Sequence, residues 1–338
     1  MSDETPDLDT RARALVEDLG LAHASDVRSV RPLTGGVASD IAVVDLGDRN
    51  ICIKFALPKL RVAADWRAPV HRNRAEYRWL AFAGSVVPDA VPRLYGWSAR
   101  HNGFAMEYLS GAEIYLWKAA MLAGTAPHGE AAQVGALLGR IHAASTLPGF
   151  DPAQFANRDD FRALRIEPYL LYTAGRYPDL AAAITALADA LHASSIALVH
   201  GDVSPKNIIF RAQGPVLLDA ECATMGDPAF DVAFCLNHLV LKAVHLPAIR
   251  GDLLASIVAF WTSYSPAVRW ESPAALVARV TALLPALMLA RVDGKSPVEY
   301  LTDASRDIVR RAGRALFIDH APTLDAFVAR FQSELAAS

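Results

Sequence analysis

The spacing of the apolar residues changes once along this chain, and that change narrows the folds open to it. In the first third, short apolar runs alternate with turns. Ile41–Leu46 and Ile51–Phe55 are typical of strands, and the Gly-Asp-Arg-Asn segment 47–50 between them is typical of a hairpin turn. Asn73–Phe82 favours a helix, and Phe104–Leu109 favours another strand. These segments predict a small, strand-rich part at the start of the chain.

Beyond about Gly111 the spacing becomes helical, in segments rich in Ala and Leu. One stretch interrupts this pattern, where the β-type runs Ala197–His200 and Pro215–Asp219 flank Asn207–Phe210 and predict a compact hairpin. The helices expected around it are Ala131–Ser145, Leu180–Ala193, Asp231–Val244, Leu253–Tyr264 and Ala274–Ala290.

The length and composition agree with an ordered protein of two parts. A chain of 338 residues with 53% hydrophobic and 20% charged residues can bury one large core or two connected ones. We therefore expect an α+β protein with a small β-rich lobe over residues 1–110 and a large helical lobe over 111–338. The net charge of −3 provides no global positive field for nucleic acid or an anionic membrane, so neither is expected as a partner.

The chain shows no sign of export or of a membrane span. Its acidic start lacks the basic-then-apolar order of a signal peptide. The most apolar tract, Leu283–Ala290, is short and is typical of a buried helix. Cys52, Cys222 and Cys235 have no metal-type spacing, which favours reduced thiols in a cytoplasmic protein. The oligomeric state stays open.

The segment His200-Gly-Asp202-Val-Ser-Pro-Lys-Asn207 carries the strongest chemical signal, together with Asp219-Ala-Glu221. Phosphoryl transfer requires a carboxylate that accepts or orients the attacking hydroxyl, and oxygen ligands for magnesium. A loop with Asp202 followed by Asn207 offers a base and one metal ligand, and Asp219 after the next strand offers another. The pattern predicts phosphoryl transfer to a hydroxyl.

These segments, with Gly226-Asp227-Pro-Ala-Phe-Asp231, resemble the aminoglycoside phosphotransferase and choline kinase-like family, whose members are relatives of the protein kinases. The resemblance covers roughly residues 28 to 310. It implies a two-lobed protein-kinase-like fold, ATP and Mg²⁺ as cofactors, and a small-molecule hydroxyl acceptor.

Carried onto this sequence, the resemblance implies that Asp202 is the catalytic base. Asn207 and Asp219 would bind magnesium, and Glu221 would assist a second metal or its waters. A structural role is favoured for His200, and a bracing role behind the catalytic loop for Asp231. Protein kinases often have Lys two residues after the base, whereas here that residue is Ser204. Whether the nearby Lys206 reaches phosphate or faces water stays open.

The nucleotide half of the site is expected near a glycine-rich segment. Thr34, Gly35, Gly36 and Ser39 precede a strand, and glycines let backbone N–H groups approach phosphates closely.

Lys54 lies inside an apolar strand, which is costly unless its ammonium meets an anion. The family resemblance implies that Lys54 binds the α- and β-phosphates and that Glu76 holds it. Glu107 and Leu109 belong to the linker whose backbone would read adenine.

A narrower resemblance points to the acceptor. Five pieces are similar to 5-methylthioribose kinases: Ala56-Leu-Pro58, Arg61, Asp65-Trp-Arg-Ala-Pro69, Glu167-Pro-Tyr169 and Arg291. Asn207 departs from that branch, where a smaller residue can occur. A sugar such as methylthioribose is thus a candidate acceptor, with Arg291 either facing it or simply ending a helix.

Other acceptors have weaker support. Aminoglycosides are polycations that need an acidic pocket, and the helical part has no dense acidic run. Choline-type acceptors need an aromatic cage, for which Trp117, Tyr169, Tyr172 and Trp261 are available, although aromatics at helical spacing more often form core. The three basic residues His238, Lys242 and His245 are expected on a partly exposed helix face.

Two other classes of protein are disfavoured. A protein kinase would carry Asp-Phe-Gly and Ala-Pro-Glu, whereas Asp219-Ala-Glu leads directly to Gly-Asp-Pro. A non-catalytic nucleotide-binding or regulatory module would be expected to lack one of the key residues. All of them are intact here: Lys54, Glu76, Asp202, Asn207 and Asp219.

Overall fold

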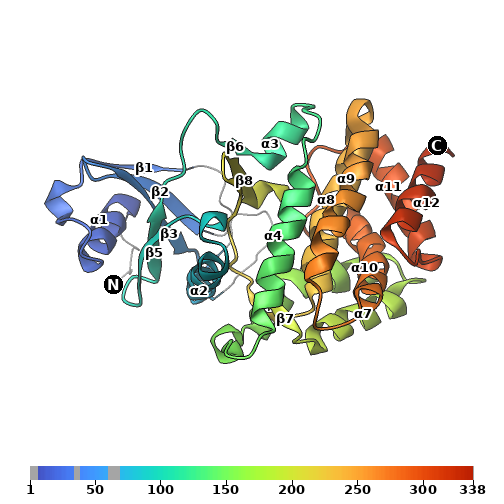
Figure 1. Cartoon of the computed structure of the whole chain (residues 1–338), viewed down its shortest axis with the longest axis horizontal. Helices are drawn as coiled ribbons and strands as arrows, with labels where there is room; N and C mark the ends of the chain where they lie inside the picture. The colour runs from blue at the N-terminus through green and yellow to red at the C-terminus, as the bar shows by residue number, and fades with distance from the viewer. Residues whose placement is uncertain (1–6, 34–38, 60–68, 338) are drawn as a thin grey trace. The chain divides into compact units, whose positions relative to one another are not determined.

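The computed structural model describes residues 7–33, 39–59 and 69–337, and the chain divides into two compact units at Ile114/Tyr115 (Figure 1). The first unit combines a sheet with short helices, and the second is mainly helical. The α+β class expected from the sequence is confirmed.

An antiparallel sheet of five strands forms the centre of the first unit, in the order β1-β2-β3-β5-β4. The expected hairpin is present: β2 and β3 pair from Ser39↔Ala56 to Asp45↔Asn50, and the Leu46 N–H donates to the Arg49 carbonyl at 2.9 Å to close the turn. The bounds are β1 Ser29–Pro32, β2 Ser39–Asp45, β3 Asn50–Ala56, β4 Leu94–Ser98 and β5 Gly103–Glu107.

Two helices pack on this sheet. Helix α1 (Leu8–Asp18) begins where the Asp7 carboxylate accepts from the Thr10 N–H at 2.8 Å, a side-chain cap. Its buried residues Ala12, Leu15 and Val16 follow helical spacing and join the core of β2 and β3. Helix α2 (Arg72–Val86) extends the expected helix at both ends and contributes Glu76 toward β3.

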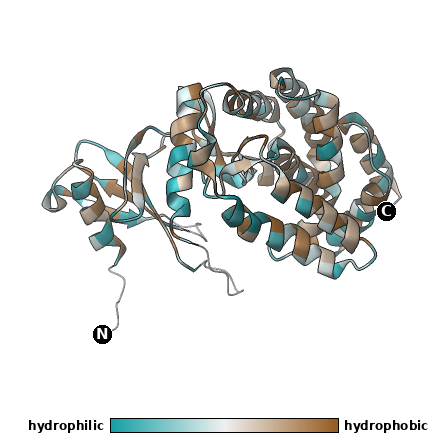
Figure 2. Cartoon of the chain, turned by 90° about the horizontal axis from the view of Figure 1, so that it is seen from below, coloured by the Kyte–Doolittle hydropathy of each residue, from teal (hydrophilic) through white to brown (hydrophobic). Residues whose placement is uncertain are grey.

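Helices make up most of the second unit, and Figure 2 shows hydrophobic and hydrophilic residues along them. Helix α8 is buried from Pro228 to Val244 and lies against α10 and α9. Helices α4 and α9 approach so closely that a Cβ on Gly135 would lie 2.3 Å from the Phe260 carbonyl oxygen. The bounds are α3 Trp117–Leu122, α4 Glu130–Ser145, α5 Arg158–Phe161, α6 Tyr172–Arg176, α7 Ala181–Ala193, α8 Pro228–His245, α9 Arg250–Tyr264, α10 Pro273–Asp293, α11 Asp303–Ile318 and α12 Leu324–Ala336.

The β-type runs of the second unit pair differently from the expectation. β8 (Ile208–Arg211) and β9 (Gly214–Leu217) form the expected hairpin, and β6 (Tyr115–Leu116) joins it. However, β7 (Ala197–Val199) pairs with β10 (Thr224–Gly226) and not with the hairpin. The β7–β10 pair therefore joins the two ends of the segment that carries Asp202 and Asp219, and the β8–β9 hairpin lies between these two acids.

Helix α10 contains the tract Leu283–Ala290, which is buried as expected. Among the described residues it is the one single helix long and apolar enough to cross a membrane, and 67% of its apolar window is buried inside the protein. The pair Pro228–His245 and Pro247–Ala267 passes the same test together but is bent by 115°.

Candidate active site

The loop between β7 and β8 has a tightly fixed backbone. Gly201 has φ +78°, and a Cβ there would lie 2.8 Å from the Cβ of Cys222, so only glycine fits. His200 is fully buried; its Nδ1 accepts from the Asp202 N–H at 3.1 Å, and its Nε2 lies 3.0 Å from the Leu218 carbonyl oxygen. Burial lowers the pKa of His200, so the neutral ring accepts at Nδ1 and donates at Nε2. His200 is thus a structural bridge between the loop and the strand end before Asp219.

Asp231, near the start of α8, braces the loop from behind, as the motif led us to expect. Its carboxylate accepts from the backbone N–H groups of His200 at 2.6 Å and Gly201 at 2.8 Å. His142 Nε2 lies 3.2 Å from the same carboxylate, and His142 Nδ1 lies 2.8 Å from the Tyr264 hydroxyl. All of these groups are buried, so the network fixes the loop against α4, α8 and α9.

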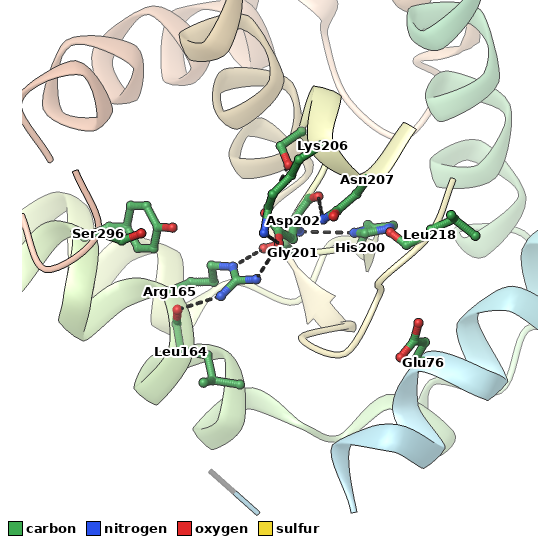
Figure 3. A network of polar contacts seen from close by, with 12 residues as sticks. Glu76, Leu164, Arg165, His200, Gly201, Asp202, Lys206, Asn207, Leu218 and Ser296 are labelled. Atoms are coloured by element: carbon green, nitrogen blue, oxygen red, sulfur yellow. Dashed lines mark hydrogen bonds and ion pairs between the residues drawn. The ribbon is translucent and has the colours of Figure 1, made fainter. Parts of the chain in front are cut away.

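The Asp202 carboxylate lies between two cations (Figure 3). Its Oδ2 is 3.0 Å from Arg165 Nη2 and 3.0 Å from Lys206 Nζ. Its Oδ1 has only a long contact of 3.5 Å with the Ser204 hydroxyl. Burial raises the pKa of Asp202, but Lys206 and Arg165 outweigh burial and hold that pKa below its usual range. The carboxylate is ionised at neutral pH, with Oδ1 its less engaged oxygen.

Lys206, whose direction the sequence left open, turns toward Asp202. Its side chain is 45% exposed, so the ammonium is held by Asp202 but reachable from solvent. Desolvation lowers the pKa of Lys206, whereas the charges of Asp202 and Asp219 raise it more, and the amine remains protonated. A protonated amine beside the carboxylate is available to an anion that arrives there.

Asn207, Asp219 and Glu221 are the residues predicted to hold magnesium. The Asn207 side-chain NH₂ donates to the Asp202 carbonyl at 3.1 Å, which leaves the amide oxygen pointing the other way. Asp219 has φ +68°, a left-handed conformation that is uncommon for a residue other than glycine and is often found at functional sites. Glu221 is 5% exposed.

Amide and carboxylate oxygens are the ligands that Mg²⁺ prefers, so this donor set fits the ion. Among the described residues, no group of three or more His, Cys, Asp or Glu side chains is arranged to hold a metal. The predicted set has two acids and one amide, and kinase sites complete such a set with phosphate oxygens and water.

Arg165 is a site residue that the sequence did not reveal. It is 6% exposed, and besides Asp202 it contacts the Gly201 carbonyl through Nε at 2.5 Å. It belongs to a π-helix over Arg162–Leu171 that contains Pro168 and ends with the Tyr172 N–H donating to the Glu167 carbonyl. Proline cannot donate the next α-helical hydrogen bond, and π-type turns are frequent at functional sites. A buried arginine needs an anion, but only the folded chain shows that Arg165 is buried.

The first unit presents Lys54 on the central strand β3, 2% exposed. Its ammonium lies 2.8 Å from Oε1 and 2.7 Å from Oε2 of Glu76 on α2. Ser39 is the first residue of β2 and is 4% exposed. The other predicted residues of the glycine-rich segment, Thr34, Gly35 and Gly36, lie outside the described residues.

The predicted adenine linker follows β5. The Glu107 N–H donates to the Arg93 carbonyl at 2.7 Å, and the Glu107 carboxylate accepts from the Arg93 N–H at 3.1 Å. Glu107 therefore ties the linker to the segment before β4. Leu109 is half-buried in the irregular segment that leads to the second unit.

Arg291, near the end of α10, is half-buried and does not simply end its helix. Its Nη1 contacts the carbonyl and the hydroxyl of Ser296, the latter at 2.9 Å, and the Tyr169 hydroxyl at 3.4 Å. The guanidinium also lies 5.7 Å from the centre of the Tyr169 ring. Arg291 thus joins α10 to the same π-helix that holds Arg165.

The cysteines and the basic residues of α8 remain to be compared with their predictions, and only the cysteines agree. The three cysteines are free and buried, and burial raises the pKa of the Cys222 thiol, in keeping with a packing residue. The expectation of a partly exposed basic face on α8 is wrong: His238 is 6% exposed and Lys242 1%, because α8 runs through the centre of the helical unit. His245 is half-buried.

Its family and its kinase relatives make this protein a small-molecule kinase. The chain belongs to the phosphotransferase enzyme family, whose model matches residues 29–254. It is 27% identical over 273 residues to the methylthioribose kinase of Klebsiella pneumoniae (strain 342). The matched region is 70% of this chain and 67% of that relative.

Two solved structures are similar over nearly the whole chain. The aminoglycoside phosphotransferase from Alicyclobacillus acidocaldarius has a TM-score of 0.53 and 16% identity, covering 99% of this chain and 98% of that one. The ethanolamine kinase from Plasmodium vivax has a TM-score of 0.51 and 12% identity, covering 99% and 91%. At these identities the likeness establishes the fold, and the expected kinase-like α+β fold is confirmed.

Proposed function

We propose that this kinase transfers the γ-phosphoryl group of ATP, in the presence of Mg²⁺, to a hydroxyl of a small molecule, with Asp202 as the base. The observation that carries the proposal is the ionised Asp202 carboxylate, buried between Arg165 and Lys206. A positioned carboxylate of this kind accepts the proton of an attacking hydroxyl.

The two oxygens of Asp202 have different tasks in this proposal. Oδ2 is occupied by Arg165 and Lys206, which keep the group ionised and fix its orientation. Oδ1, with its single long contact to Ser204, is the oxygen that meets the acceptor hydroxyl. Lys206 lies close enough to the carboxylate to contact the transferring phosphoryl group as well, as a point charge.

Asn207 and Asp219 would hold Mg²⁺, with Glu221 supporting a second ion or its waters. When bound, the metal supplies positive charge to the phosphate oxygens. In the first unit, Lys54 would bind the α- and β-phosphates while Glu76 holds its ammonium in place. Ser39, with Thr34, Gly35 and Gly36, would cover the phosphates, and the backbone of Glu107 and Leu109 would meet the adenine.

For the acceptor, a sugar such as methylthioribose is our first candidate. Its support is the similarity to methylthioribose kinases and the contact between the half-buried Arg291 and the buried Tyr169, whose polar groups suit a polyhydroxylated molecule. Aminoglycosides and amino alcohols are the alternative, and a non-catalytic nucleotide-binding module is the outcome if no transfer occurs. We place the protein in the cytoplasm, in keeping with its free buried cysteines.

The experiment is Mg²⁺-dependent ADP release from ATP over a panel of acceptors. The panel holds methylthioribose and other pentoses, hexoses, aminoglycosides, choline, ethanolamine and homoserine. Asp202→Asn should lose about 10²- to 10⁴-fold in kcat while still binding ATP. Asp189→Asn, an exposed aspartate on α7, is the matched control and should retain full activity. Near-normal turnover by Asp202→Asn would overturn the assignment of the base.

A further inference from the structure

Helix α8 carries a buried amine that nothing in the described residues neutralises. Lys242 is 1% exposed, and its ammonium makes no hydrogen bond or ion pair with the described residues; it lies 5.1 Å from the centre of the Tyr300 ring. An unpaired ammonium is costly to bury. In agreement, burial, with Lys118 and Arg291 adding to it, lowers the pKa of Lys242 to about 7. An amine buried in this way would gain a partner if an anion bound beside it.

Two residues that interact with this amine carry unsatisfied donors of their own. The hydroxyl of Tyr300 and Nε of Arg291 are both buried without a hydrogen-bond partner. The Tyr300 ring contacts the His245 ring on one side, with centres 5.0 Å apart, and faces Lys242. One native acid, Glu299, is close, but it is already paired with Lys118 at 2.5 Å. The cluster therefore has an excess of positive charge and spare donors.

The charged groups that act on Lys242 come from four elements, and the sum of their charges is positive. Lys118 from α3 and Arg291 from α10 lower the pKa of Lys242. Glu299, from the segment after α10, and Cys235, earlier on α8 itself, raise that pKa. A negatively charged ligand would balance the excess positive charge of such a cluster.

Aromatic side chains connect the cluster to the π-helix Arg162–Leu171 and back to α8. Arg291 contacts the Tyr169 hydroxyl, the Tyr169 ring packs on Phe234 with centres 5.4 Å apart, and Phe234 packs on His238 at 5.6 Å. His238 lies one helical turn before Lys242 and is close enough to Lys206 for that charge to lower its pKa. The buried cations and the base Asp202 thus lie in one region of the helical unit.

We propose that Lys242, Arg291 and Tyr300 form an anion-binding subsite of the acceptor pocket, and that the acceptor is a polyhydroxylated molecule with a carboxylate or phosphate group. This inference rests on the proposed kinase function. It replaces a neutral sugar, such as methylthioribose, by a sugar acid or a sugar phosphate as the first candidate acceptor. The anion gives Lys242 its missing partner and the Tyr300 hydroxyl its missing acceptor. The same positive charge excludes polycationic aminoglycosides and quaternary amines.

The subsite can be tested by binding alone, without nucleotide. Two matched pairs separate the sources of the anion: ribose against ribose 5-phosphate, and glucose against glucuronate. Because hydrogen bonds to charged groups are strong, we expect the anionic member of at least one pair to bind about 10- to 100-fold more tightly than its neutral partner. Calorimetry or a thermal shift measures the difference.

Three variants test the residues. Lys242→Met should abolish the preference for the anion and leave the melting temperature of the free protein unchanged or higher, since it removes an unpaired buried charge. Tyr300→Phe, which removes only the hydroxyl, should weaken anion binding several-fold. Lys295→Met, in which another lysine near a tyrosine ring lies exposed, is the control and should keep the preference.

The outcomes separate this inference from the kinase proposal. Equal binding of anionic and neutral partners would overturn the subsite, whatever the enzyme phosphorylates. So would a lower melting temperature in Lys242→Met with unchanged anion binding, because Lys242 would then be structural. Anion preference that depends on Lys242 supports the subsite, and if phosphoryl transfer is nevertheless absent, only the kinase proposal fails.

Discussion

The contact between Arg165 and Asp202 leads to a prediction with a worked magnitude. At the 3.0 Å separation of the two charges, and with an effective dielectric constant of about 20, Coulomb's law gives roughly 5 kcal/mol of gross attraction. Desolvation of the buried pair offsets much of this energy, and Lys206 remains beside Asp202 when Arg165 is removed. A charged hydrogen bond is worth about 1.5 to 3 kcal/mol net, which corresponds to about 1 to 2 pKa units.

We therefore expect Arg165→Met to raise the pKa of Asp202 by about 1 to 2 units. The base is active as a carboxylate, so the acid limb of the kcat/KM profile should move to higher pH by the same amount. The free energy of unfolding at low pH should change as well. A carboxylate with a lowered pKa in the folded state stabilises the fold above its unfolded pKa, and this contribution is lost as pH falls through the folded pKa.

In the wild-type protein that loss falls below the ordinary aspartate pKa of about 3.9, whereas Arg165→Met brings the folded-state pKa of Asp202 closer to that value, so the loss of stability in acid should be smaller. The assays are the pH dependence of ADP release with the best acceptor and the pH dependence of urea unfolding. Arg162→Met, in which a half-exposed arginine of the same π-helix is changed, is the matched control and should leave both profiles unmoved. An acid limb at the same pH in folded Arg165→Met would refute the reasoning.

Two further substitutions test the backbone of the catalytic loop. Gly201→Ala forces a Cβ to within 2.8 Å of Cys222 at φ +78°, and should destabilise the fold by about 2 to 4 kcal/mol in urea unfolding and lower kcat; a wild-type midpoint would mean that the loop relaxes freely. Asp231→Asn turns one acceptor oxygen toward the His200 and Gly201 N–H groups into a donor, and should cost about 1 to 3 kcal/mol, measured the same way. The control is Asp179→Asn, which changes an exposed aspartate of an ion pair. Equal losses of unfolding free energy in Asp231→Asn and Asp179→Asn would contradict the bracing role of Asp231.

Local patterns predicted the elements that hold the candidate site. The alternation around residues 47–50 predicted the β2–β3 hairpin, and the lysine inside an apolar strand marked Lys54 as a charge in need of a partner. These predictions succeeded in their geometry because each depends on neighbours in sequence, or on a single residue type that is out of place. The functional roles of these residues remain predictions.

Contacts between distant segments could not be predicted in this way. Arg165 contacts the catalytic loop, while His142 contacts Asp231 and Tyr264 contacts His142. The three come from separate helices, and no local pattern marks them. The pairing of β7 with β10, and not with the hairpin that is nearer in sequence, likewise joins segments that are far apart along the chain.

The sequence by itself determined the class of chemistry in this protein, because the order of His200, Asp202, Asn207 and Asp219 records which groups follow each strand. Tertiary structure alone decided how those groups are charged and supported. Burial turned Lys242, expected on an exposed face, into an unpaired amine, and it placed Arg165 against Asp202. The physical reason is that pKa and binding depend on desolvation and on the nearest opposite charge, and both are set by residues far away in the chain.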